Sequence, residues 1–205
     1  MGRSINTRPL RDKFYIITNG KETEYNYFSL LKQKKSLYEV CIEFQNKDPL
    51  GLVEYACKYK NNANQIWVVF DIDNTYEQKR LIPAIKKAEI ERVKYAFSNI
   101  SFEVWLISHF EQCSKEMSEE QLERKITDYL KKQKEGLVYD KSNEEQLKKY
   151  FIPNYPIAVE NAKIVYQTKM AEHNKIYGTN TRPHIWRWNS STNVFQLIEA
   201  LKLGK

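Results

Sequence analysis

An unbroken apolar run, Ile66 to Phe70, leads directly into a pair of aspartates, Asp71 and Asp73. Such a run, without alternation of apolar and polar residues, is typical of a strand buried on both faces in a parallel sheet. Ligands of these sheets bind beyond the carboxyl ends of the strands, where Asp71 and Asp73 would lie. Side chains at i and i+2 of a strand point the same way, so both carboxylates would face one Mg²⁺ or Mn²⁺ ion. A polar turn after the strand would explain the same residues without a metal.

Strand and helix signals alternate through the first half of the chain. We expect strands at 14–18, 37–44, 66–71 and 92–97, and helices at 23–34, 48–59, 77–91 and 101–111. This alternation predicts βαβ units, and therefore an α/β fold with a parallel sheet of about four strands flanked by helices. The α/β core would span residues 14–112, after a basic N-terminal arm at residues 1–13.

The second half of the chain, residues 113–205, is expected to form a mainly helical subdomain that packs on the core. Its apolar periodicity predicts helices at 118–136, 143–151 and 157–175, the first opened by a capping box at Ser118. A closing helix would follow Asn193, which we interpret first as a helix cap and second as a site residue.

The charge and composition of the chain limit the classes of partner that it is expected to bind. A formal net charge of +7 favours a polyanion, with nucleic acid ahead of a membrane surface. The three cysteines are far apart and form no CxxC pair, so neither a zinc site nor a disulfide framework is indicated. We expect no membrane association, because the chain shows no signal peptide and no apolar run of about 20 residues, and we expect a cytoplasmic location.

Acidic residues follow three of the predicted strands. Glu22 and Glu24 follow the first strand, Asp71 and Asp73 end the third, and Glu103 follows the fourth. Taken singly, the glutamates could simply stabilise a solvated turn or a helix N-terminus. Parallel strands would instead bring all of these acids to one edge of the sheet, where they would repel each other unless cations bind. Such a cluster in a basic protein is what metal-dependent phosphodiester chemistry requires.

Four ordered motifs resemble those of the RloB-like family: FYIITNGKETEYNYF, VVFDIDN, SNISFEVWLISHF and SSTNVFQLIEAL. The resemblance covers nearly the whole chain and implies a Toprim-like core and a role in bacterial defence. It also implies Mg²⁺ binding by a glutamate after the first strand and by the DxD pair, Asp71 and Asp73. At the position of that glutamate this chain has Asn19, whose amide oxygen is a weaker ligand and cannot act as a general base. The resemblance extends to Glu24 and Glu103, and either Glu22 or Glu24 could replace the missing acid.

Two further sets of residues are candidates for nucleic-acid contacts. The C-terminal segment interleaves cations with aromatics at Arg182, His184, Trp186 and Arg187, a composition suited to stacking bases and holding phosphates. Core packing of the tryptophans, Trp186 and its neighbour Trp188, would explain the same pattern. Lys21, beside the acids of the first group, is a candidate for a phosphate contact. His109 is interpreted as a core histidine, with proton transfer or a phosphate contact as the alternative.

The expected function is therefore a Mg²⁺- or Mn²⁺-dependent nuclease of bacterial anti-phage defence. Its catalytic residues would be Glu24, Asp71, Asp73 and Glu103, with Asn19 and Glu22 as further metal ligands. Structured RNA such as tRNA loops is the first choice of substrate, ahead of DNA. The alternatives are a catalytically impaired module that binds nucleic acid or regulates an ATPase partner, and a nucleotide phosphohydrolase. The sequence predicts no oligomeric state.

Overall fold

The computed structural model describes residues 12–34, 36–72 and 78–203. The strands are β1 (Lys13–Thr18), β2 (Glu39–Phe44), β3 (Gln65–Asp71), β4 (Lys94–Asn99) and β5 (Ser191–Thr192). The helices are α1 (Thr23–Lys32), α2 (Pro49–Ala56), α3 (Gln78–Glu91), α4 (Glu103–Ser108), α5 (Glu119–Gln133), α6 (Glu144–Gln146), α7 (Tyr155–Tyr177) and α8 (Val194–Ala200). Short 3₁₀ turns lie at Cys57–Tyr59, Ile152–Asn154 and Ile185–Arg187, and a π turn lies at Leu147–Phe151. The predicted basic arm lies outside the described residues except for its end.

The strands form one sheet in the order β2-β1-β3-β4-β5. The first four strands are parallel, which confirms the predicted α/β class and the four parallel strands. The fifth strand was not predicted: β5 pairs antiparallel with the end of β4, through Ser98 with Thr192 and Asn99 with Ser191. This pairing explains why β4 runs to Asn99, two residues beyond its predicted end.

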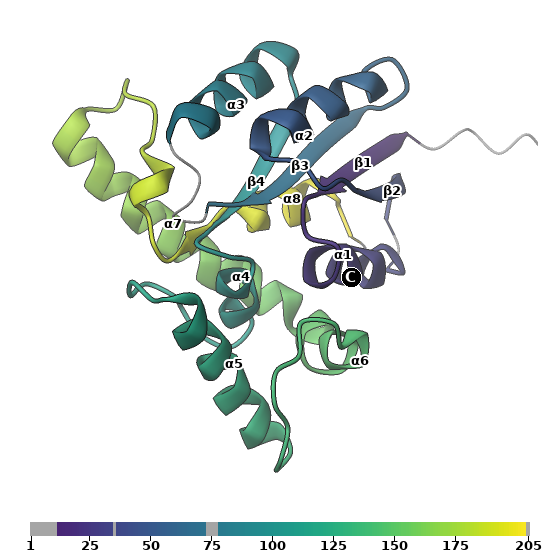
Figure 1. Ribbon diagram of the computed structural model, residues 1–205, viewed down its shortest axis with the longest axis vertical. Helices are drawn as coiled ribbons and strands as arrows, with labels where there is room; N and C mark the ends of the chain where they lie inside the picture. Colours follow the sequence, from purple (N-terminus) through teal and green to yellow (C-terminus); the bar gives the residue numbers. More distant parts are fainter. Residues whose placement is uncertain (1–11, 35, 73–77, 204–205) are drawn as a thin grey trace, which may run out of the picture.

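Helices cover both faces of the sheet, with α2 and α3 on one side and α1 and α8 on the other (Figure 1). The apolar run from Ile66 to Phe70 is buried on both faces, as predicted. Val68 and Phe70 pack in the cluster with α2 and α3, whereas Trp67 and Val69 pack in the cluster with α1 and α8. By this alternation Asp71 belongs to the α1 side.

The C-terminal half shares its core with the sheet. Leu122, Ile126 and Leu130 of α5 belong to the same buried cluster as Trp105 of α4 and the inner residues of α1. The predicted capping box opens α5: the Gln121 amide donates to Ser118 Oγ at 3.3 Å, and the Ser118 amide donates to Gln121 Oε1 at 2.9 Å. Among the described residues, no helix is long and apolar enough to cross a membrane.

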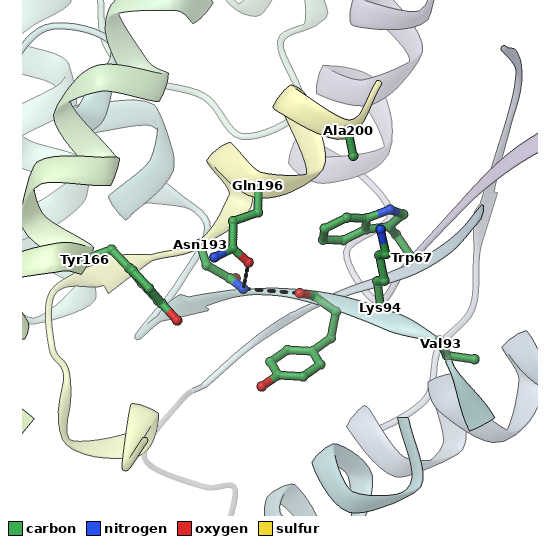
Figure 2. Close-up of a pocket in the computed structure, with 8 residues that line it drawn as sticks. Trp67, Val93, Lys94, Tyr166, Asn193, Gln196 and Ala200 are labelled. Atoms are coloured by element: carbon green, nitrogen blue, oxygen red, sulfur yellow. Dashed lines mark hydrogen bonds between the residues drawn. The ribbon is translucent and has the colours of Figure 1, made fainter. Parts of the chain in front are cut away.

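Asn193 has a different role from the predicted helix cap. It stands at the N-cap position of α8, but its side chain does not cap the helix. Its Oδ1 accepts a hydrogen bond from the Phe97 amide at 2.6 Å. Its Nδ2 donates to the Tyr95 carbonyl at 3.2 Å and to Gln196 Oε1 at 3.2 Å (Figure 2). The Asn193 side chain therefore holds α8 against β4.

Candidate active site

Three carboxylates from three elements meet beyond the carboxyl ends of the parallel strands. Asp71 is the last residue of β3, Glu24 lies in the first turn of α1, and Glu103 is the first residue of α4. Glu24 is 6% exposed and Glu103 is 3% exposed, although carboxylates are rarely buried without a partner. The sequence prediction that the acids share one edge of the sheet agrees with this arrangement for these three residues.

Gly20 is the reason that the Glu24 carboxylate can lie where it does. A Cβ placed on Gly20 would stand 1.7 Å from Glu24 Oε2 and 2.0 Å from its carboxyl carbon. The loop after β1 therefore passes directly against the carboxylate. Here the glycine of the Asn-Gly pair serves a close approach of backbone to side chain.

Burial and nearby negative charge raise the pKa values of Glu24 and Asp71 above their usual range. Burial, followed by the charge on Glu103, raises the pKa of Glu24 to about 7. Burial also raises the pKa of Asp71 well above its usual value, and the charges on Glu24 and Glu103 act in the same direction. A bound cation would remove this repulsion, so the electrostatics favour one at this position.

Within the part of the chain that the structure describes, three buried oxygen atoms at the same edge have no hydrogen-bond partner. They are Asn19 Oδ1, Asp71 Oδ1 and Ser101 Oγ. Buried polar atoms are almost always paired, so oxygen atoms without a protein partner are suited to bind a cation or a water molecule. Ser101 does not cap the helix that follows, because α4 begins after Phe102 and carries no side-chain cap.

The loop between α5 and α6, residues 134–143, contributes two polar groups that sequence reasoning missed. The Tyr139 hydroxyl donates to Glu103 Oε1 at 3.0 Å, and Lys141 Nζ lies 3.5 Å from the same oxygen. Lys141 Nζ also pairs with Glu123 of α5 at 3.0 Å, and its carbonyl accepts from Thr23 Oγ1 at 3.3 Å. Although burial opposes it, the charges on Glu103 and Glu123 raise the pKa of Lys141, so its ammonium stays protonated.

The described residues provide only some of the ligands that a metal site needs. Within residues 12–34, 36–72 and 78–203, no three histidine, cysteine, aspartate or glutamate side chains are grouped so as to hold one ion. Asp73, the second acid of the predicted pair, lies outside the described residues. The predicted ligand Glu22 is exposed at the N-cap position of α1 and makes no cap hydrogen bond. What fits a hard divalent cation is the donor chemistry: unpartnered amide and carboxylate oxygens on Asn19 and Asp71, beside the carboxyl of Glu24.

His109 is a core residue, as first interpreted. It is buried, its Nε2 lies 3.0 Å from the Tyr27 hydroxyl, and its Nδ1 lies 3.0 Å from the Trp105 carbonyl. Burial lowers its pKa to about 4, which keeps the imidazole neutral.

The C-terminal cations and aromatics lie on the other face of the sheet from the acids. Trp188 is 5% exposed and Trp186 is partly buried, both against the cluster that includes α2 and α3, so core packing accounts for much of this pattern. Arg182 pairs with Glu89 at 2.6 Å, and Arg187 donates to the Tyr177 hydroxyl at 3.0 Å. His184 packs edge-on against the Tyr177 ring, with centroids 4.5 Å apart. A role of this segment in nucleic-acid binding stays a prediction.

A cavity of about 440 Å³ lies at the opposite end of the strands from the acids. It is lined by Trp67, Lys94 and Tyr95 near the starts of β3 and β4, and by Asn193 and Gln196 (Figure 2). None of the buried acids lines this cavity, so it is not part of the candidate active site.

The chain matches the model of a known protein family. The family model described as RloB-like protein matches residues 14–201, which is nearly the whole chain. No curated protein and no solved structure is significantly similar to the chain.

Proposed function

The chain belongs to the RloB-like protein family, and we propose that it is a divalent-metal-dependent nuclease that cuts RNA in bacterial anti-phage defence. The observation that carries the proposal is the group of buried carboxyls with raised pKa values beside the unpartnered oxygens of Asn19 and Asp71. A soluble scaffold has no need of such a cluster, because burying repelling acids destabilises the fold.

The residues suited to hold Mg²⁺ or Mn²⁺ are Asp71, Asn19 and Glu24, with Asp73 expected to join them. When bound, such an ion polarises a phosphoryl oxygen and lowers the pKa of a water molecule. In the metal-free protein the pKa of Glu24 is raised to about 7, and a bound cation would favour its ionised form as a ligand. Lys141 supplies a permanent positive charge at the same edge, where it could contact a substrate phosphate.

The net charge of +7 supports a nucleic-acid substrate, because a basic surface attracts the phosphate backbone and releases its counterions. RNA with unpaired loops is the preferred substrate. DNA and free nucleotides are the alternatives that the same acids could serve.

The decisive experiment compares wild type with Asp71→Asn on panels of tRNA, single- and double-stranded DNA, and nucleotides, with Mg²⁺, Mn²⁺ or EDTA. We expect wild type to cut RNA only with metal, and Asp71→Asn to lose at least about 100-fold in rate, as is typical when a charge-stabilising group is removed. Asp128→Asn, an exposed acid on α5, is the matched control and should cut normally. Equal behaviour of wild type and Asp71→Asn would contradict the enzyme proposal.

The defence role is tested in cells. Bacteria that express the wild-type gene, with any neighbouring ATPase gene, should resist phage, and bacteria that express Asp71→Asn should not. Equal plating of phage on both strains would contradict this part of the proposal while leaving the nuclease activity to its own test.

A second candidate function is a nucleic-acid-binding module with impaired catalysis, favoured by Asn19 at the position where the resemblance implies a glutamate. This candidate predicts salt-sensitive binding of nucleic acid without cleavage in any metal. Asn19→Glu separates the two readings. If the wild-type site is impaired, the Asn19→Glu protein should cut nucleic acid that wild type does not cut. If the wild-type site is already active, the substitution should change the cleavage rate much less.

A further inference from the structure

A second cavity lies beside the acidic cluster, between α1 and the edge strand β2. Its volume is about 510 Å³, within the range of roughly 300–1,000 Å³ typical of small-molecule sites. The lining side chains that matter are Lys21, Tyr25, Asn26, Ile42, Phe44 and Gln45.

The cavity and the acids share one edge of the sheet. Phe44 ends β2 in register with Thr18, and the Gln45 amide donates to the Thr18 carbonyl at 2.9 Å. Tyr25 directly follows Glu24 in α1, and successive helix residues point about 100° apart. One turn of α1 therefore carries a buried carboxyl toward β3 and an exposed aromatic ring toward β2.

Four polar side chains of the cavity make no hydrogen bond or ion pair within the described part of the protein. Among the hydrogen bonds and ion pairs of the described residues, none uses the side chain of Lys21, Tyr25, Asn26 or Gln45. The contrast is Glu43, which also lines the cavity but whose carboxylate accepts bonds of 2.8–2.9 Å from Tyr55 and Tyr59. An unengaged amide pair, a cation and a ring that is 36% exposed are thus available to a ligand.

We propose that this cavity binds one unpaired base of a nucleic-acid strand, an inference that rests on the proposed function and names its substrate as single-stranded. The Tyr25 ring offers a stacking surface, with Phe44 and Ile42 as the apolar wall. Asn26 and Gln45 can each donate and accept hydrogen bonds at a base edge. Lys21 holds a phosphate of the same strand, which then continues to the acids. A base paired inside a duplex could not enter, so the cavity selects loops and single strands.

The test measures binding of the full chain in EDTA, where no cleavage occurs, by fluorescence anisotropy. One ligand is a short oligouridylate, and the other is an abasic strand of the same length and charge. We expect wild type to bind the base-bearing strand about tenfold more tightly, as base stacking on one aromatic side chain typically gives. Tyr25→Ala should bind both strands alike, whereas Tyr25→Phe keeps the ring and the preference. Lys21→Gln should weaken the binding of both strands equally.

Equal binding of the two strands by wild type, or a preference that persists in Tyr25→Ala, overturns the inference. If Tyr25→Ala does not fold, Gln45→Ala and the wild-type comparison still decide it. The outcome is separate from that of the nuclease proposal. Metal-dependent cleavage without a preference for the base-bearing strand would contradict only the proposal for the cavity. A preference for the base-bearing strand without cleavage would contradict only the nuclease proposal.

Discussion

Glu24 concentrates the electrostatics of the candidate site in one residue. Its pKa of about 7 in the folded protein exceeds the unfolded value of 4.5, because burial and Glu103 disfavour the charged form. Between these pH values the folded state holds a proton that the unfolded state has released. The free energy of unfolding therefore falls as pH rises from 4.5 through 7, by about 3 kcal/mol for Glu24 alone.

We predict that metal-free Glu24→Gln loses this part of the pH dependence. His109 acts in the opposite direction: its folded pKa of about 4 lies below the usual 6.5, so its contribution is lost as pH falls through that interval. The difference between wild type and Glu24→Gln cancels the contribution of His109 and reports Glu24 together with its effect on Asp71. Thermal unfolding from pH 5 to 8 is the measurement, and Mg²⁺ should stabilise wild type most at the highest pH. Parallel curves for the two proteins would contradict the raised pKa.

Gly20 is the second residue on which the site depends. Gly20→Ala should destabilise the protein by about 1–3 kcal/mol, because the new methyl group overlaps the Glu24 carboxylate. In a Glu24→Ala background the same change should cost much less, since the overlapping group is gone. Denaturant unfolding of the four proteins in this cycle measures the coupling. Additive effects would mean that the two residues do not touch.

At the scale of elements, the 134–143 loop links the helical half of the chain to the acids. Lys141→Met leaves Glu103 with a buried charge and the Tyr139 hydroxyl as its remaining partner in that loop. Because the Lys141 side chain is 42% exposed, the free energy of unfolding should fall by about 1 kcal/mol. Breaking a fully buried ion pair would cost much more. Mg²⁺ should restore part of the lost stability. Lys148→Met is the matched control, because the ion pair of Lys148 with Glu145 is exposed. The stability of this variant should equal that of wild type with or without metal.

The elements that sequence predicts well are those with a local signal. The buried run before Asp71, the alternation of strands and helices, and the Ser118 capping box each follow from neighbouring residues. β5 has only two residues, and its place is set by pairing with the end of β4, where Ser98 lies 94 residues before Thr192. Tyr139 and Lys141 lie in a loop without periodicity, so only tertiary packing brings them to Glu103. The buried acids could be anticipated from parallel strand ends, but the cavity at Tyr25 depends on how α1 meets β2.

At the scale of the whole molecule, the first half of the chain does not bury all of its apolar surface by itself. Trp105 and Leu106 of α4 share their cluster with Leu122 and Ile126 of α5 and with Val194 of α8. We predict that a chain ending at residue 112 does not unfold cooperatively, whereas the full chain does. Circular dichroism during heating measures this difference. A cooperative transition of the shortened chain would instead establish residues 14–112 as an independent domain.

The pairing of β4 with β5 has a consequence for biosynthesis. The Phe97 amide is made 96 residues before the Asn193 oxygen that accepts its hydrogen bond. At roughly 5–20 residues per second, a ribosome needs about 5–20 s to supply that partner. During this interval the outer edge of β4 in the nascent polypeptide is open to pairing with other strands. Translation pauses between β4 and β5 should therefore increase misfolding of this protein, and chaperones that shield strand edges should reduce it.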